Sequence, residues 1–254
     1  MENDDRRNKR NNRYFNKTYG KLIAAGFIAG IVLIVADYLT GGIVVLAITV
    51  ALLILVIKIT PSDKEMDQQL QLVMDELGGI ALEKHGITEA QANKTSPLIL
   101  GGYMSELMGD DVKNVFKQAA GAIGGQTGQE LADTAISAIE SGLISGIKYK
   151  KGRDGIIRAS AAEFTIFQFS ENQVFIYTLQ FSLIGSEIKE SSREYFYRDI
   201  VSISTETEKS GSHVFTIKIS GGDSEEVPYG REEAPDFQQK INAFRQLIRD
   251  KKNA

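Results

Sequence analysis

Two places in the chain have the spacing of a serine nucleophile activated by a lysine. Ser145 precedes Lys148 by three residues, and Ser186 precedes Lys189 in the same way. The S-x-x-K pair is common in ordinary sequences, and the S-D-N and K-T-G motifs that accompany it in enzymes are missing, as are G-x-S-x-G and H-E-x-x-H. We therefore predict no catalytic residues, and a protein that is not an enzyme.

Metal and cofactor chemistry has few residues to use. The chain has no cysteine and two histidines, which excludes thiolate zinc sites, cysteine nucleophiles and disulfides. We expect His85 to be a cation at the end of a helix and His213 to lie at the surface. The glycine-rich residues 121–128 lack the lysine of a phosphate-binding loop and the G-x-G-x-x-G order, so we expect a connector there. No metal and no cofactor is predicted.

Adjacent acidic residues occur in three predicted turns or helix starts, where carboxylates cap a helix or face water. These pairs are Asp110 with Asp111, Glu225 with Glu226, and Glu232 with Glu233. We expect none of them to act in general acid-base catalysis.

The most suggestive chemistry is a cluster of five basic residues. The cluster consists of Lys148, Lys150, Lys151, Arg153 and Arg158. Each Lys or Arg close to an anionic membrane surface contributes about 1 kcal/mol to binding. The cluster therefore predicts a site for anionic lipid head groups or for a partner, and the alternative is a solvated, glycine-containing loop.

The elements that position these residues begin with an apolar stretch over residues 22–59. Thr40, Gly41 and Gly42 interrupt it and predict a turn between two helices, at 22–39 and 43–59. With a rise of about 1.5 Å per residue, each helix spans roughly 26 Å, close to the thickness of a hydrocarbon core. A cleavable signal peptide fits less well, because its apolar region is only about 7 to 15 residues long. We expect a transmembrane hairpin.

The distribution of basic residues predicts the orientation of this hairpin. Residues 1–21 hold seven Lys or Arg and three acidic residues, Lys58 and Lys64 follow the second helix, and the turn has no basic residue. By the positive-inside rule, residues 1–21 form a basic cytoplasmic tail and both termini are cytoplasmic. We predict a multi-pass protein of the cell's inner membrane.

Small residues four positions apart occur on both apolar helices. They are Gly26 and Gly30 on the first, and Ala47 and Ala51 on the second. Such spacing lets helix backbones approach closely. It predicts packing within the hairpin, with Gly30 across from Ala51, or alternatively a homodimer seam on Gly26 and Gly30. Asp37, beside the turn, is expected at the level of the head groups.

Residues 62–142 are predicted to be a helical, glycine-rich middle segment. Ser62 and Glu65 have the spacing of a capping box and begin a helix that ends near Gly86. Further helices are expected after Thr88 and over residues 110–120 and 128–141. A short strand is expected over residues 97–103 or 143–150.

From residue 143 the apolar residues alternate with a period of two, which is typical of strands. Strands are expected over residues 163–169, 172–183, 188–196, 200–207 and 213–219. The last element, residues 235–250, has an apolar stripe of Phe237, Ile241, Phe244 and Ile248 and predicts an amphipathic helix. The fold class is therefore α+β.

The segment from Tyr195 to Ser204, the hairpin around Gly211, the turn at residues 221–223 and the final helix together resemble bacterial pleckstrin-homology-like (PH-like, GRAM-related) domains. The similarity covers roughly residues 160–250. The resemblance implies an antiparallel sheet that bends into a partly open barrel capped by the helix, and a role in binding lipid or protein. If residues 97–103 supply the seventh strand, residues 105–141 are a helical insertion, and otherwise residues 62–142 are a separate unit.

These features predict a non-enzymatic, membrane-anchored scaffold or binding protein, whose partners are the bilayer with anionic lipid or another membrane protein. The alternative is a self-associating, channel-like component regulated by the soluble domain. After residue 21 the chain has 22 basic and 30 acidic residues, which disfavours nucleic acid as a partner.

Overall fold

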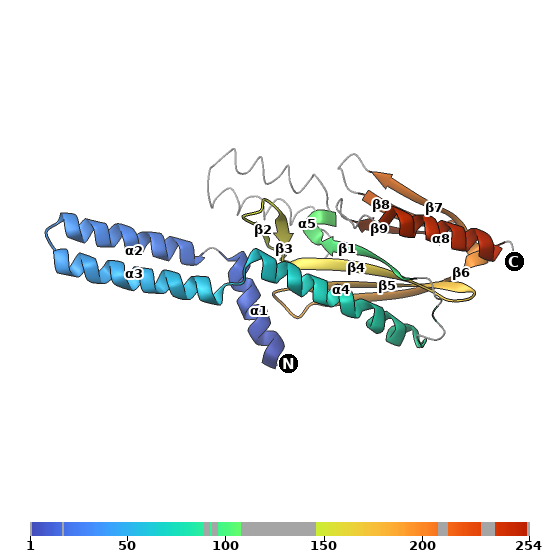
Figure 1. Cartoon of the computed structure of the whole chain (residues 1–254), viewed down its shortest axis with the longest axis horizontal. Coiled ribbons are helices and arrows are strands. Elements are labelled where there is room, and N and C mark those ends of the chain that lie inside the picture. Colours follow the sequence, from blue (N-terminus) through green and yellow to red (C-terminus); the bar gives the residue numbers. More distant parts are fainter. Residues whose placement is uncertain are drawn as a thin grey trace. The chain divides into compact units, whose positions relative to one another are not determined.

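The computed structural model describes residues 2–16, 18–88, 92, 96–107, 146–207, 213–229 and 237–252. The chain forms two compact units, Met1–Asp67 with Leu183–Gly185, and Gln68–Ser182 with Ser186–Ala254. The first unit is helical and the second combines helices with antiparallel sheet, which confirms an α+β chain (Figure 1). The helices expected after Thr88 and over residues 110–120 and 128–141, and the glycine-rich connector, lie outside the described residues.

Helix α1 (Glu2–Phe15) occupies most of the predicted basic tail. One side of it is fixed by asparagines: the Nδ2 groups of Asn8 and Asn11 each donate a 2.9 Å hydrogen bond, to the carbonyls of Gly185 and Leu183. Asn11 is fully buried. Since a buried amide must have a partner, these two bonds explain why the segment is a docked helix.

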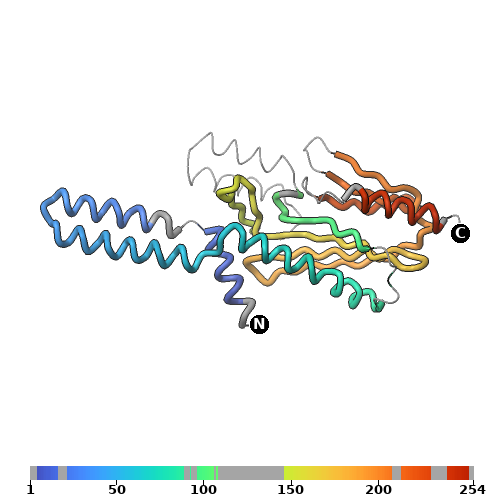
Figure 2. The backbone as a smooth tube through the Cα atoms, in the orientation of Figure 1, coloured from blue at the N-terminus to red at the C-terminus, as the bar shows by residue number. Residues whose placement is uncertain are grey.

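Helices α2 (Thr18–Val35) and α3 (Leu39–Ile59) run back along each other (Figure 2). The turn between them lies at residues 36–38, so the turn predicted at Thr40, Gly41 and Gly42 is wrong. Asp37 makes the turn with a φ of 65°, and the Gly42 amide already donates to the Tyr38 carbonyl inside α3. The two glycines are therefore helical, and the lack of a side chain at Gly42 serves packing against α2.

The surface of this helix pair is apolar on the outside as well as between the helices. Val35 is 79% exposed, and Ile28 and Ile57 are each 63% exposed. Among the described helices, the one that begins at Leu39 is long and apolar enough to cross a membrane, and a shorter apolar helix covers Leu22–Val35.

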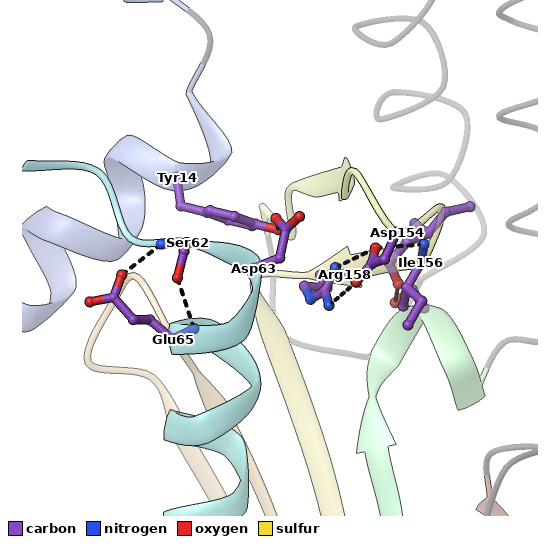
Figure 3. Close-up of polar contacts among 9 residues, drawn as sticks. Tyr14, Ser62, Asp63, Glu65, Asp154, Ile156 and Arg158 are labelled. Carbon is purple, nitrogen blue, oxygen red and sulfur yellow. Dashed lines mark hydrogen bonds and ion pairs between the residues drawn. The ribbon is translucent and has the colours of Figure 1, made fainter. Parts of the chain in front are cut away.

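Helix α4 (Asp63–His85) begins and ends as predicted. The Ser62 amide donates to Glu65 at 2.7 Å and the Glu65 amide donates to Ser62 Oγ at 3.2 Å, so the capping box is formed (Figure 3). At the other end Gly86 has a φ of 65°, and the amides of Gly86 and Ile87 donate to the carbonyls of Glu83 and Leu82. This pair of bonds is a Schellman motif, which requires a residue that tolerates the left-handed conformation.

The second unit contains three antiparallel sheets. The largest has the order β1-β4-β5-β6, β2 and β3 form a hairpin of their own, and the third has the order β7-β8-β9. The strands are β1 (Leu98–Tyr103), β2 (Tyr149–Lys151), β3 (Ile157–Ala159), β4 (Ala161–Phe169), β5 (Gln173–Ser182), β6 (Ile188–Phe196), β7 (Ile200–Thr207), β8 (His213–Ile219) and β9 (Ser224–Tyr229). None of these sheets closes into the expected barrel within the described residues.

The five predicted strands are all present, as is the strand expected at residues 97–103. Two short elements separate neighbours: the one-turn helix α5 (Met104–Leu107) follows β1, and η1 (Tyr197–Asp199) joins β6 to β7. Strands β3 and β9 were not predicted. Charged residues at Arg158 and Glu225 and a proline at Pro228 hide the alternation there.

The main core lies between the two larger sheets and the last helix, α8 (Phe237–Lys252). Phe167 and Phe169 of β4, Phe215 of β8 and Phe244 of α8 pack there, with ring centroids of the last two 6.0 Å apart. Ile241 and Ile248 are also buried. Ile241, Phe244 and Ile248 of the predicted amphipathic stripe therefore lie on the face of α8 that covers the core, and the side chain of Phe237 lies outside the described part.

Candidate functional site

The predicted basic cluster lies on the β2–β3 hairpin. Lys150 pairs with Arg158 and Lys151 with Ile157 across the two strands. The base of the hairpin is fixed by the Ser160 amide, which donates to the Lys148 carbonyl at 2.8 Å, and by Ser105 Oγ, which donates to the Ile157 carbonyl. The structure thus brings the five basic residues onto one small element.

Arg158 does not belong to the surface of this hairpin. It is 1% exposed, and its guanidinium makes two bonds to the Asp154 carboxylate, of 2.6 Å and 3.1 Å (Figure 3). The same carboxylate accepts a 3.0 Å bond from the Ile156 amide. The Arg158 bonds, followed by that of Ile156, lower the pKa of Asp154 to about 2. The prediction of Arg158 as a binding residue is therefore not supported, because its charge is used inside the hairpin.

The remaining basic residues differ in exposure. Lys151 and Arg153 are exposed, whereas Lys148 and Lys150 are half-buried. Ile156, at the end of the hairpin, is 42% exposed. The Gly152 amide donates to the Ile156 carbonyl at 2.8 Å, so the loop that carries these side chains is ordered. The hairpin therefore presents two cations beside one apolar side chain.

Of the four small residues predicted to pack the apolar helices together, two lie between α2 and α3 and two do not. A Cβ on Gly26 would lie 2.5 Å from Thr49 Oγ1, and one on Gly30 would lie 2.7 Å from Leu46, so both glycines face α3. Ala47 and Ala51 are exposed and lie outside this interface. Because the observed turn comes earlier in the sequence than the predicted one, the residues of α3 that face α2 also come earlier. Gly30 therefore meets Leu46 and Gly42 in place of Ala51. Gly26 and Gly30 therefore lie at the contact between α2 and α3, whereas Ala47 and Ala51 do not.

A second polar group, which the sequence did not reveal, surrounds His85. Its side chain is 1% exposed, its Nδ1 lies 3.2 Å from Ser192 Oγ and 3.8 Å from Glu194 Oε1, and its ring lies 4.8 Å from that of Phe175. Burial lowers the pKa of His85 and outweighs the effect of Glu194, which raises it. The expectation of a helix-end cation is therefore wrong: His85 is a buried neutral side chain.

The residues around His85 come from two strands whose register explains the meeting. Phe175 pairs with Glu194 and Tyr177 with Ser192, so these four side chains share one face of the sheet. The Lys84 ammonium binds Glu190 two positions along β6. The alternating charged residues of β6 were the available signal in the sequence. Their role becomes clear only when the pairing of β6 with β5 is known.

The His85 group does not have the geometry of a serine nucleophile with its base. In such a site the serine and the carboxylate bind opposite ring nitrogens of the histidine. Here Ser192 and Glu194 both face Nδ1, and Nε2 is buried without a hydrogen-bond partner. The arrangement attaches the end of α4 to the sheet and does not activate Ser192.

Glu225, expected to be solvated, is instead 9% exposed. Its carboxylate binds the Arg193 guanidinium through both oxygens and accepts a 2.5 Å bond from the Tyr195 hydroxyl. Burial, then the bond to Glu225, raises the pKa of Tyr195 to about 12, so the tyrosine stays a donor. These contacts join β6 to β9.

Within the part of the chain that the structure describes, no group of three or more His, Asp or Glu side chains could hold a metal ion. Comparison of the chain with models of protein families, with curated proteins and with solved structures finds no match.

Proposed function

We propose that the chain is a non-enzymatic, membrane-anchored binding protein. In this proposal α2 and α3 cross the inner membrane as a hairpin, and both termini are cytoplasmic. The sheet unit, related to PH-like domains, binds anionic lipid or another membrane protein at the cytoplasmic surface. The resemblance and the order of sheets followed by a final helix support a binding role.

The observation that carries this proposal is the apolar outer surface of the helix pair. A helix of a water-soluble protein buries one apolar stripe and exposes polar residues on the other side. On α3, Ile43, Ile48 and Leu52 are all at least 50% exposed, and Thr49 is buried. Such a surface is stable in hydrocarbon and unstable in water.

The channel-like alternative has less support. The one buried polar side chain in the described parts of α2 and α3 is Thr49, and its hydroxyl donates to the Val45 carbonyl of its own helix. A residue whose hydroxyl is bound in this way does not line a polar path.

Membrane extraction tests the anchor. Full-length protein is expected to stay in the membrane pellet at alkaline pH, and Ile48→Arg with Leu52→Arg is expected to reduce that fraction, because each Arg near a bilayer centre costs about 2.5 to 3.5 kcal/mol. Leu72→Arg on α4, at a position 61% exposed, is the matched control and should not change it. Wild-type protein in the soluble fraction contradicts the proposal.

Topology is tested separately with reporters fused to each terminus. If both termini are cytoplasmic, protease should cleave both reporters in inside-out vesicles. In intact cells it should cleave neither. Reporters found on opposite sides contradict the hairpin.

Lipid binding by the basic cluster is tested with the full chain in nanodiscs. Amide exchange over residues 150–156 should be slower in discs with phosphatidylglycerol than in discs of phosphatidylcholine alone. Lys151→Glu with Arg153→Glu should remove the difference, since each charge contributes about 1 kcal/mol. Arg198→Glu with Lys218→Glu, at exposed positions elsewhere, is the matched control. Equal exchange rates in both kinds of disc would contradict lipid binding by the hairpin, and another protein would remain as the proposed partner.

A further inference from the structure

The last turn of α4 is held to the large sheet by a histidine whose second ring nitrogen, Nε2, is buried without a hydrogen-bond partner. His85 is the final residue of α4, and its ring packs against Phe175 on the sheet. Every polar contact that the structure shows for this ring is at Nδ1, and Nε2 is buried with no hydrogen-bond partner. A neutral ring can satisfy Nδ1 and leave a bare lone pair at Nε2.

Protonation changes this balance. The imidazolium has an N–H at both nitrogens, so the Nε2–H would be a buried donor without an acceptor and would carry part of a positive charge. In water the same group is fully hydrated. Release of the ring from the sheet is therefore the way in which the molecule accommodates the proton.

The charged and titratable groups that face His85 do not compensate for this. From β6, Glu194 favours the charged ring, but it lies 3.8 Å from Nδ1 and its side chain is 52% exposed, so water screens it. Glu190, also of β6, is already paired with Lys84 of α4. From β5, burial of the Tyr177 hydroxyl, followed by the nearby Glu190, raises its pKa to about 12, so this tyrosine stays protonated and brings no negative charge to the ring.

We propose that His85 is a pH-sensitive latch, which holds the last turn of α4 on strands β5 and β6 at neutral pH and releases it in mildly acidic solution. This device goes beyond lipid or protein binding and does not depend on which of them the sheet unit binds.

The direction follows from linkage. Burial lowers the pKa of His85 in the folded chain below its ordinary value of 6.5. The released ring therefore binds protons more strongly than the packed ring, and the attachment loses stability as the pH falls below 6.5. For each pH unit in this range the ratio of attached to released turn falls by at most about tenfold.

Amide hydrogen exchange of full-length protein in nanodiscs tests the latch. Protection of residues 80–85, corrected for intrinsic exchange, should fall by up to about tenfold between pH 6.5 and 5.5. His85→Phe keeps a ring against Phe175 and removes the titration, so its protection should be the same at both pH values. His213→Phe, which changes the other histidine of the chain, is the matched control and should respond as the wild type does. Equal protection of the wild type at both values overturns the proposal.

Glu194→Gln keeps the test decisive if His85→Phe packs poorly. If His85 is the titrating group, this variant retains the loss of protection in acid. Removing the Glu194 charge makes the packed His85 ring bind a proton still more weakly, and the released ring is unaffected. If the loss came from the carboxylate, the variant would abolish it, and the proposal would be wrong. With only two histidines, imidazole NMR signals give the pKa of His85 directly, and a value at or above 6.5 also overturns it.

Discussion

Buried polar side chains decide which charges of the sheet unit can reach a partner. Arg158 and Glu225 are charged residues that the sequence places in a basic loop and a turn, yet both are buried. Arg158 binds Asp154, and Glu225 binds Arg193 and Tyr195. Removing one member of such a pair leaves the other without its partner, and this costs more than the pair contributes in net terms. Substitutions at these positions therefore report on stability, whereas Lys151 and Arg153 are exposed and are the positions at which the proposed binding is tested.

Asp154→Ala is expected to destabilise the hairpin, because it removes two bonds from the buried Arg158 and one from the Ile156 amide. Hydrogen bonds to charged groups are worth about 1.5 to 3 kcal/mol, and the half-exposed position of Asp154 places the expected loss near the lower end. The urea midpoint of the sheet unit measures it, with Asp250→Ala on exposed α8 surface as the control. A midpoint equal to that of the control contradicts the role of Asp154.

The pH dependence of the same pair has the same sign as that of His85 and lies in a more acidic range. The pKa of Asp154 falls from 3.8 to about 2 in the folded chain. Its contribution is therefore complete above 3.8 and is lost as the pH falls toward about 2. Urea stability should decline more steeply over this acid range in wild-type protein than in Asp154→Ala, in which only the other carboxylates titrate.

At the scale of elements, two glycines in α2 to α4 have different structural roles and a third has none of them. Gly42 allows close helix contact, because a Cβ there would lie 2.4 Å from Ile34 and 2.8 Å from the Gly30 carbonyl oxygen. Gly86 ends α4 with a positive φ. Gly79 lies within α4 with open space around it and has neither role.

Gly42→Ala should separate α2 from α3, since the new methyl group meets backbone that cannot yield. Overpacking of this kind typically costs about 1 to 3 kcal/mol, and the thermal midpoint of the full chain in detergent micelles should fall. Gly41→Ala is the neighbouring control, because nothing lies within 4 Å of its Cβ position. Equal midpoints for the two variants would show that the helices do not meet at Gly42.

Gly86→Ala and Gly79→Ala should shift stability in opposite directions. An L-residue in the left-handed conformation costs about 1 to 2 kcal/mol, whereas replacing a helix-interior glycine with alanine gains about 0.5 to 1 kcal/mol. Amide exchange along α4 measures both. A gain in protection for Gly86→Ala would contradict the Schellman motif.

Signals confined to neighbouring residues predicted the elements well. The alternation of β5 and the Ser62–Glu65 spacing each depend on residues a few positions apart, and both were correct. The α2–α3 turn was misplaced because glycine in a close-packed helix has the same appearance in the sequence as glycine in a turn. The surroundings of His85 depend on contacts between distant segments, which no local pattern contains. The Arg158–Asp154 pair is local, four positions apart, but the burial of Arg158 is not visible in the sequence.

At the scale of the whole molecule, one core holds the sheet unit together. Sheets β1-β4-β5-β6 and β7-β8-β9 share it with α8, and Phe244 contacts the rings of Phe167, Phe169 and Phe215. Among the described strands no sheet edge closes on another, so this packing stands in place of the barrel closure that the resemblance implied.

Phe244→Ala should cost about 3 to 5 kcal/mol, the usual effect of truncating a buried aromatic residue. Tyrosine fluorescence during urea unfolding would measure this, since Tyr197 is buried in the same core and the chain has no tryptophan. Phe196→Ala, at a position 46% exposed, is the control and should cost far less. Similar losses for both variants would contradict a core centred on α8.

The pairing of β1 with β4 also has a consequence for how the chain assembles during synthesis. Tyr103 pairs with Ala162, and Leu98 with Phe167, whereas β4 and β5 pair across a short turn at Ser170. A ribosome releases β1 well before any of its partners exists, and closing the longer loop costs more entropy than closing the hairpin. We therefore expect the sheet to nucleate at the β4–β5 hairpin and β1 to join later, as an edge strand of this sheet, when the apolar helices that precede it have already left the ribosome.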